Sequence, residues 1–137
     1  MSTWVPESCV IELLDFKLRG GHEAPVAASR VARVTERYLD ETGSRDVTAV
    51  VTEIVAWLAG GAVPHTLGLQ LSVTSSVVRI SVTAAHTAPK YKTLESNELL
   101  RSTLPVTATL ATRYGMEASR RTRIWAEFDR PVAHNGR

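Results

Sequence analysis

The chain has 137 residues, of which 44% are hydrophobic and 22% are charged, and its formal net charge is +2. This length and composition predict one globular domain over residues 1–137, with short flexible ends at about 1–8 and 130–137. The sequence has no apolar run of the roughly 18 to 20 residues that span a bilayer, and acids interrupt its first residues, MSTWVPESCVIELLDF, where a secretory signal is apolar. We therefore expect a cytoplasmic protein without a membrane partner.

The first predicted element is a strand from Cys9 to Arg19, where apolar and polar residues roughly alternate until Gly20 and Gly21 interrupt the pattern. Cys9 is the single cysteine and stands in an apolar run, so a buried structural thiol is expected there. One cysteine and four scattered histidines give no metal-ligand spacing. Neither a metal nor a cofactor is therefore predicted.

Two helices are predicted next. Between Glu23 and Thr42 four apolar residues recur at the helical period, and Gly43 is expected to end this helix. The four are Ala27, Val31, Val34 and Tyr38. A second helix is predicted from about Asp46 to Ala59, and it is apolar nearly all round, which indicates a helix covered by other elements.

A β-hairpin follows in the prediction. Two alternating runs, Leu67–Val73 and Val77–Val82, are separated by three small polar residues, which is typical of two strands joined by a tight turn. The segment 84–97 is poor in large apolar residues and predicts a long connecting loop, whose order the sequence leaves open.

The C-terminal part predicts a helix and a last strand. The helix covers about 98–114, with Pro105 either in its first turn or at a break between two shorter helices. The chain is then expected to turn at Gly115 and to end with a strand at 122–128. The whole order predicts an α+β two-layer sandwich, with a mixed, mostly antiparallel sheet and about three helices on one face.

The basic residues are unevenly placed. One group, Arg30, Arg33 and Arg37, follows the helical period of the first predicted helix. A second group lies near the C-terminus and comprises Arg113, Arg120, Arg121, Arg123 and Arg130. Such clusters serve acidic protein partners, phosphates or nucleic acid, and composition does not choose among these. A merely solvated helix face explains the first group equally well.

Three phrases of the sequence resemble those of a known family. Val51–Leu58, VTEIVAWL, aligns with a family helix that reads E-L-V-x-N-A. Leu110–Met116, LATRYGM, aligns with the family phrase L-A-x-R-W-G-V. Thr122–Phe128, TRIWAEF, aligns with the family's closing strand, T-x-V-W-A-E-L. With the element order, they resemble the ATP-binding domains of the anti-sigma factor serine kinases, which belong to the histidine kinase, gyrase and Hsp90-like ATPases. The resemblance covers about Leu13 to Phe128 and implies a Bergerat fold for nearly the whole chain.

The same resemblance implies where catalytic groups would lie. In active relatives the helix glutamate polarises the attacking hydroxyl, and an asparagine four residues later coordinates magnesium. Glu53 stands at the first position and Trp57 at the second. An indole offers one N–H donor and no oxygen, so Trp57 cannot ligate a hard cation. Glu53 is then a vestigial acid at the edge of a former pocket.

Two further motifs have also lost their chemistry. Ala84 stands where the family has its adenine-reading aspartate, in the phrase AAHTAP that includes His86, and the family's glycines are missing. The glycine-rich phosphate loop should fall near Arg101, where only Leu104 matches. These losses together argue against Mg-ATP phosphoryl transfer, so we expect no enzyme activity. The former nucleotide pocket would be lined by Glu53, Trp57, Ala84, His86, Arg101 and Thr103.

The resemblance implies a regulator that works by protein contact. Its expected partner is a sigma factor or a STAS-type antagonist, and a homodimer through the sheet edge and first helix is common in the family. Arg30 aligns with a first-helix arginine that faces the partner in the serine kinases, and Arg33 and Arg37 extend that face. Arginine suits this role because its planar fork binds carboxylates.

Other functions stay open at this point. A sensor could bind a flat or sugar-like ligand in the remodelled pocket, which Trp57, Ala84, His86 and Tyr91 would line, although the sequence favours Trp57 as ordinary core. A residual serine kinase would first have to bind nucleotide. Direct nucleic-acid binding through Arg120, Arg121 and Arg123 is not expected, because charges before an edge strand also discourage aggregation of sheets.

Overall fold

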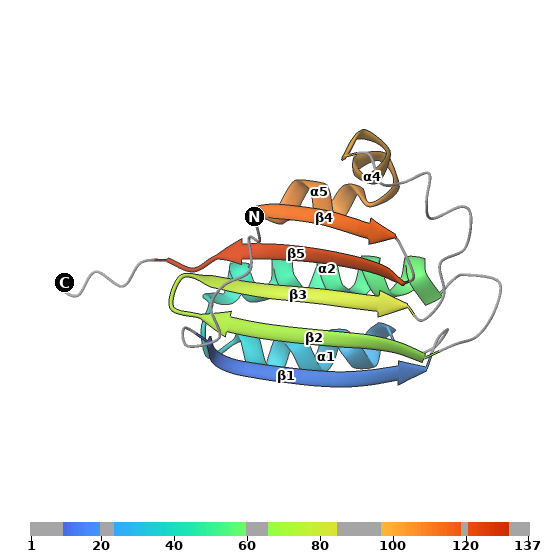
Figure 1. The fold of residues 1–137 in the computed structure, drawn as a ribbon. Coiled ribbons are helices and arrows are strands. Elements are labelled where there is room, and N and C mark those ends of the chain that lie inside the picture. The colour runs from blue at the N-terminus through green and yellow to red at the C-terminus, as the bar shows by residue number, and fades with distance from the viewer. Residues whose placement is uncertain (1–9, 20–23, 60–65, 85–96, 119–120, 132–137) are drawn as a thin grey trace.

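The computed structural model describes residues 10–19, 24–59, 66–84, 97–118 and 121–131 (Figure 1). The element order is β1 (Val10–Arg19), α1 (Ala24–Thr35), α2 (Glu41–Ala59), β2 (Thr66–Thr74), β3 (Val77–Ala84), α4 (Asn97–Thr103), α5 (Pro105–Leu110), β4 (Arg113–Ala118) and β5 (Thr122–Asp129). Cys9, the expected flexible end at 1–8, residues 132–137 of the expected flexible end at about 130–137, and most of the predicted loop, 85–96, lie outside the described residues.

The strands form one sheet in the order β1-β2-β3-β5-β4. Every pairing within it is antiparallel, so the expectation of a mixed sheet is corrected for the part of the chain that the structure describes. Short connections explain two of these pairings, because β3 begins three residues after β2 ends and β5 begins four residues after β4 ends. β1 and β4 are the two edges of the sheet.

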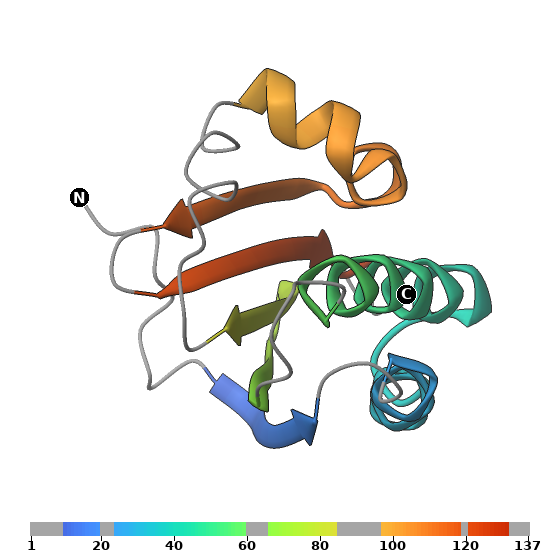
Figure 2. The ribbon, with the colours of Figure 1, turned by 90° about the vertical axis from the view of Figure 1, so that its right-hand side faces the viewer.

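The predicted two-layer arrangement is confirmed. Figure 2 shows α1 and α2 on one face of the sheet, and α5 packs beside α2 near the β4 edge. No described helix covers the other face, which we call the helix-free face. In the described residues no helix is both long and apolar enough to cross a membrane.

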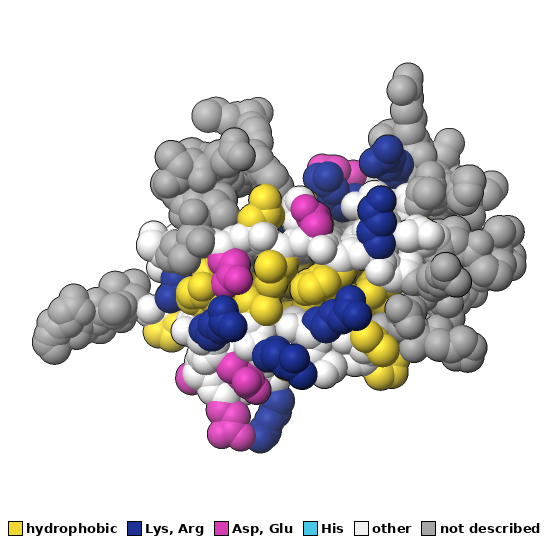
Figure 3. All heavy atoms as spheres, turned by 90° about the horizontal axis from the view of Figure 1, so that it is seen from below, with side chains coloured by type: hydrophobic (Ala, Val, Ile, Leu, Met, Phe, Trp, Pro, Cys, Tyr) yellow, Lys and Arg dark blue, Asp and Glu magenta, His cyan; other side chains and the backbone are white. Residues whose placement is uncertain are grey.

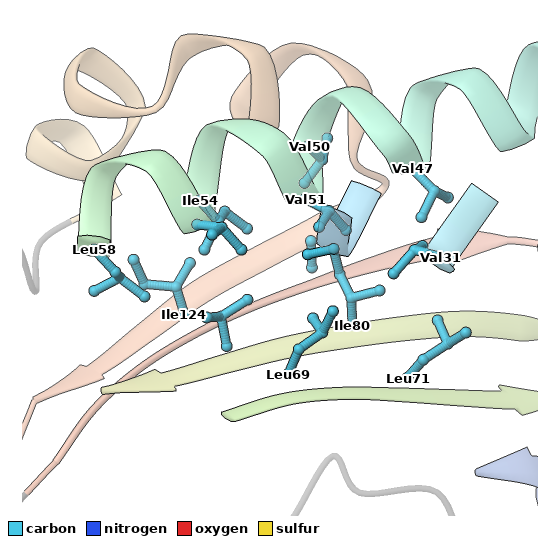
Figure 4. Close-up of a cluster of buried hydrophobic side chains, with 14 of the residues drawn as sticks. Val31, Val47, Val50, Val51, Ile54, Leu58, Leu69, Leu71, Ile80 and Ile124 are labelled. Atoms are coloured by element: carbon cyan, nitrogen blue, oxygen red, sulfur yellow. The ribbon is translucent and has the colours of Figure 1, made fainter. Parts of the chain in front are cut away.

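The core lies between α1, α2 and the sheet. Alternate residues of each strand point at the helices, as the period of a strand requires, and the apolar side of α2 meets them. Burying one such aliphatic side chain contributes about 1.5–3 kcal/mol relative to leaving it in water. Figure 4 shows this contact, with Val31 of α1, Val47, Val50, Val51, Ile54 and Leu58 of α2, and Leu69, Leu71, Ile80 and Ile124 of the sheet.

The boundary between the first two helices differs from the prediction. α1 ends at Thr35 instead of Thr42, and α2 begins at Glu41, so Gly43 lies inside α2. The cause is Asp40, whose carboxylate accepts a hydrogen bond from the backbone N–H of Gly43 at 2.7 Å. A carboxylate that binds the third N–H of a helix is a typical N-cap, and its charge also suits the helix dipole.

The C-terminal part contains a strand that the prediction lacked. Gly115, expected in a turn, is buried in the middle of β4 and pairs with Trp125 of β5. A Cβ atom on Gly115 would lie 2.7 Å from Cζ2 of Trp125, so the glycine makes room for the indole. The predicted helix is also shorter and ends at Leu110, with the break before Pro105 that was one of the two expectations.

Candidate functional site

Glu53 of α2 holds the start of α5. Its Oε1 accepts hydrogen bonds from the backbone N–H of Thr107 at 2.7 Å and from the Thr107 hydroxyl at 2.8 Å, and its Oε2 accepts one from the backbone N–H of Val106 at 3.0 Å. Leu104, the residue before α5, has no side-chain capping bond. Glu53 therefore supplies from another helix the cap that α5 lacks, with its negative charge at the positive helix end.

These bonds engage both carboxylate oxygens of the residue that the family resemblance aligned with a catalytic glutamate. Thr107 is completely buried, so its hydroxyl and amide need this acceptor. Glu53 thus has a structural task that requires no nucleotide. That it is catalytically inert stays a prediction.

The other positions that the family resemblance assigned to a nucleotide pocket are spread over the core and the surface. Trp57 lies one turn after Glu53 and packs, partly buried, against the hydrophobic core. Ala84 ends β3 and is completely buried in the same core. Arg101 of α4 is exposed, whereas Thr103, at the end of that helix, is partly buried. The structure therefore brings Trp57 and Ala84 to one core and leaves Arg101 at the surface.

His86 and Tyr91 lie outside the described residues, so the sensor hypothesis is not tested by their positions. Hollows that described residues line lie at other places. One, of about 540 Å³, lies between α1 and the start of α2 and is lined by Ala32, Glu36, Leu39, Asp40, Glu41, Ser44, Arg45 and Thr48. Another, of about 360 Å³, lies on the helix-free face. Within the described ranges, no group of three or more His, Cys, Asp or Glu side chains is placed to hold a metal ion.

A surface of a different kind lies where α1 meets the edge strand β1. Four partly buried residues contribute apolar surface there and pack against the core: Leu14, Phe16, Val34 and Tyr38. Seen from below the view of Figure 1, a band of hydrophobic side chains runs across this side of the molecule, with Lys and Arg and also Asp and Glu beside it (Figure 3). We call these four residues with Arg30, Arg33 and Arg37 the α1–β1 seam.

The predicted arginine group lies on the seam. Arg30 and Arg33 are exposed on α1, and Arg37 is exposed in the turn that follows this helix. The guanidinium carbon of Arg30 lies 5.7 Å from the centroid of the Phe16 ring, which is a cation–π distance between α1 and β1. This contact orders Arg30 over an apolar surface while its N–H groups stay available to a partner.

Hydrogen bonds fix one end of the seam. The Tyr38 hydroxyl donates to Oε1 of Glu12 at 2.7 Å, and this bond raises the pKa of Tyr38. The guanidinium carbon of Arg130 lies 5.1 Å from the Tyr38 ring centroid, and its Nη1 donates to the carbonyl of Thr74 at 2.6 Å. These contacts could not be predicted from the sequence, because they join residues from four separate parts of the chain.

The helix-free face carries an ion-pair network that the sequence patterns do not predict. Buried Glu127 accepts from Nη1 of Arg79 at 2.8 Å and from Nε of Arg113 at 2.7 Å, and Arg113 also bonds Asp129. The bonds to Glu127 and Asp129 raise the pKa of Arg113. Arg79 also stacks on Trp125, with 4.6 Å between guanidinium carbon and ring centroid. The network depends on the strand register, which places Arg79 and Arg113 on either side of Glu127. Knowledge of this register would have been needed to predict it.

The fold and the seam together define a two-layer α+β domain with one helix-covered face and an apolar, arginine-rimmed edge. No protein-family model matches the chain, and no curated protein matches it. Among solved structures, a chain in the crystal structure of the SiaB–SiaC complex from Pseudomonas aeruginosa has a similar fold, with a TM-score of 0.62. The match covers 88% of this chain and 90% of that chain at 11% sequence identity, so the likeness is one of fold.

Proposed function

We propose that this protein is a non-catalytic regulator that binds another protein through the α1–β1 seam. The observation that best supports this proposal is the apolar band of the seam, with Arg30 stacked over Phe16 at its margin. The similar fold belongs to a chain solved in a complex of two proteins, which agrees with a role in protein binding.

The chemistry of the seam indicates the kind of partner. Apolar and aromatic side chains with arginines beside them are the composition that protein interfaces favour, and arginines often contribute much of the binding energy. Three exposed arginines also favour a surface with carboxylates around an apolar contact. Within this proposal, the resemblance of the sequence to anti-sigma kinases suggests a sigma factor or a STAS-type antagonist.

The non-catalytic part of the proposal rests on the former nucleotide pocket. Glu53 is engaged at the start of α5, Trp57 offers no oxygen ligand to magnesium, and Ala84 offers no acceptor to an adenine. We therefore regard the chain as a degenerate Bergerat domain, a pseudokinase that acts in the cytoplasm. A homodimer belongs to the same proposal, with β1 as its open sheet edge.

The test is binding of purified sigma factors and STAS-domain proteins from the same organism, measured by surface plasmon resonance. Replacing Arg30 with Glu should weaken capture of the partner by roughly tenfold or more, because a carboxylate would then face the partner's carboxylates. Arg45→Glu is the matched control, since Arg45 is exposed on α2 and pairs only locally, with Glu41.

Equal affinities for the wild type and Arg30→Glu would contradict the seam as the binding surface. Equal losses in Arg30→Glu and Arg45→Glu would do so as well, because only the overall charge would then matter. Circular dichroism of both variants checks that the fold is intact.

A further inference from the structure

The hollow on the helix-free face is built from three neighbouring strands. Its lining residues are Lys17, Thr66, Leu67, Gly68, Thr83 and Arg121. The register places Lys17 of β1 opposite Gly68 of β2, and Gly68 opposite Thr83 of β3. Leu18, Leu67 and Ala84, the next residues along these strands, are buried in the core. Because successive side chains of a strand point to opposite faces, the row Lys17–Gly68–Thr83 faces away from the helices.

Gly68 makes the row concave. A Cβ atom built at this position meets no other atom within 4 Å, so the space above the backbone is open. Glycine inside a strand weakens it, and such a position often marks close approach of a ligand. The floor of the hollow is therefore strand backbone, and its walls are the longer side chains on either side of Gly68.

Those walls carry hydrogen-bond donors and positive charge. Lys17 and Arg121 are both exposed, and within the described part of the chain neither forms an ion pair. Thr66 and Thr83 add hydroxyl groups. The row continues from Thr83 to Arg123, whose carboxylate partner, Glu117, is 3.9 Å away. Positive charge thus predominates around the hollow, and an anion would be attracted to it.

We propose that this hollow binds a phosphate group, either as free phosphate or as part of a small phosphate monoester. Two cations with hydroxyl donors suit a dianion with several acceptor oxygens better than a carboxylate with one charge. A volume of about 360 Å³ leaves space beyond the phosphate for the rest of a small ligand. The site lies on a different face from the α1–β1 seam, so this proposal can be tested independently of the proposed function.

The experiment is a titration of the ¹⁵N-labelled full chain at constant ionic strength, followed by amide chemical shifts. The probes are inorganic phosphate, O-phosphoserine and adenosine 5′-monophosphate. We expect saturable shifts at the amides of Gly68 and Thr83. Tighter binding of a monoester than of inorganic phosphate would identify the monoester as the ligand class, and equal binding would identify phosphate itself.

Gly68→Val separates a built site from diffuse charge. Valine fits an extended strand and the open space above Gly68, so the variant should fold, but its side chain covers the floor of the hollow between Lys17 and Thr83 and should abolish the saturable shifts. Lys17→Gln and Arg121→Gln should each weaken binding severalfold. Arg45→Gln, which removes a positive charge elsewhere, should bind like the wild type.

Two results would overturn the proposal. One is the absence of saturable shifts with all three probes at millimolar concentration. The other is undiminished phosphate binding by Gly68→Val, because an ion held only by surface charge would not need the hollow. The dispersion of the amide spectrum reports on folding of each variant.

Discussion

At Glu53, three hydrogen bonds connect α2 to the first turn of α5 and satisfy groups that α5 cannot satisfy itself. Replacing Glu53 with Ala removes the only acceptor described for the buried Thr107 hydroxyl and for two helix-end amides. We expect a loss of about 1–3 kcal/mol in the free energy of unfolding, measured by urea denaturation.

Glu36→Ala is the matched control, because Glu36 is an exposed acid in the turn after α1. Hydrogen exchange should show faster opening at Thr107 in the Glu53 variant and unchanged rates in the control. Wild-type stability in Glu53→Ala would show that the carboxylate does not cap α5 in solution.

Gly115 and Gly68 both lie in strands, but the space around them differs, so an added methyl group should affect stability in opposite ways. Gly115→Ala places a Cβ atom 2.7 Å from the Trp125 ring, and displacing that ring should cost about 1–3 kcal/mol of unfolding free energy. Gly68→Ala meets nothing within 4 Å and should leave stability unchanged or raise it by up to about 1 kcal/mol. Thermal unfolding compares the pair, and similar melting temperatures would contradict the contact between Gly115 and Trp125.

At the scale of elements, sequence patterns predicted those helices and strands whose formation depends on residues close together in the chain. The β2–β3 hairpin follows from two alternating runs around a small polar turn, and α2 follows from its apolar surface. The end of α1 and the existence of β4 depend on particular contacts instead. Asp40 caps the start of α2, so Gly43 lies inside α2 and does not end α1. Gly115, which was expected in a turn, lies in β4 instead, where it makes room for Trp125 of the neighbouring strand.

The candidate sites divide in the same way. The arginine stripe of the seam could be predicted, because it follows the helical period of one segment. The role of Glu53 could not, since its partners are more than 50 residues away in sequence. The hollow was equally hidden, because Lys17, Gly68 and Thr83 become neighbours only through the strand register.

At the scale of the whole molecule, β1 contributes to two surfaces, because its alternate residues face opposite sides of the sheet. Leu14 and Phe16 point toward the helix side and form part of the seam, whereas Lys17 lies on the helix-free face at the hollow. As an edge strand, β1 is also the place where a second chain can add to the sheet. A protein partner and a small anion could therefore bind to opposite sides of one strand.

Whether the chain has any affinity for nucleotide is a property of the whole molecule, and titration calorimetry with Mg-ATP and Mg-ADP measures it. We expect no heat of binding up to millimolar nucleotide. The Glu53 carboxylate is engaged by α5, and Trp57, which packs against the core, offers magnesium no oxygen ligand. An active anti-sigma kinase is the positive control.

The hollow on the helix-free face complicates this titration, because it would accept the phosphates of a nucleotide. Gly68→Val resolves the ambiguity, since its side chain covers the floor of the hollow and leaves Glu53 and Trp57 unchanged. Heat that disappears in this variant belongs to the hollow and leaves the pseudokinase proposal intact. Heat that persists in Gly68→Val would come from a rebuilt nucleotide site, and serine kinase activity toward the bound partner would then be the next measurement.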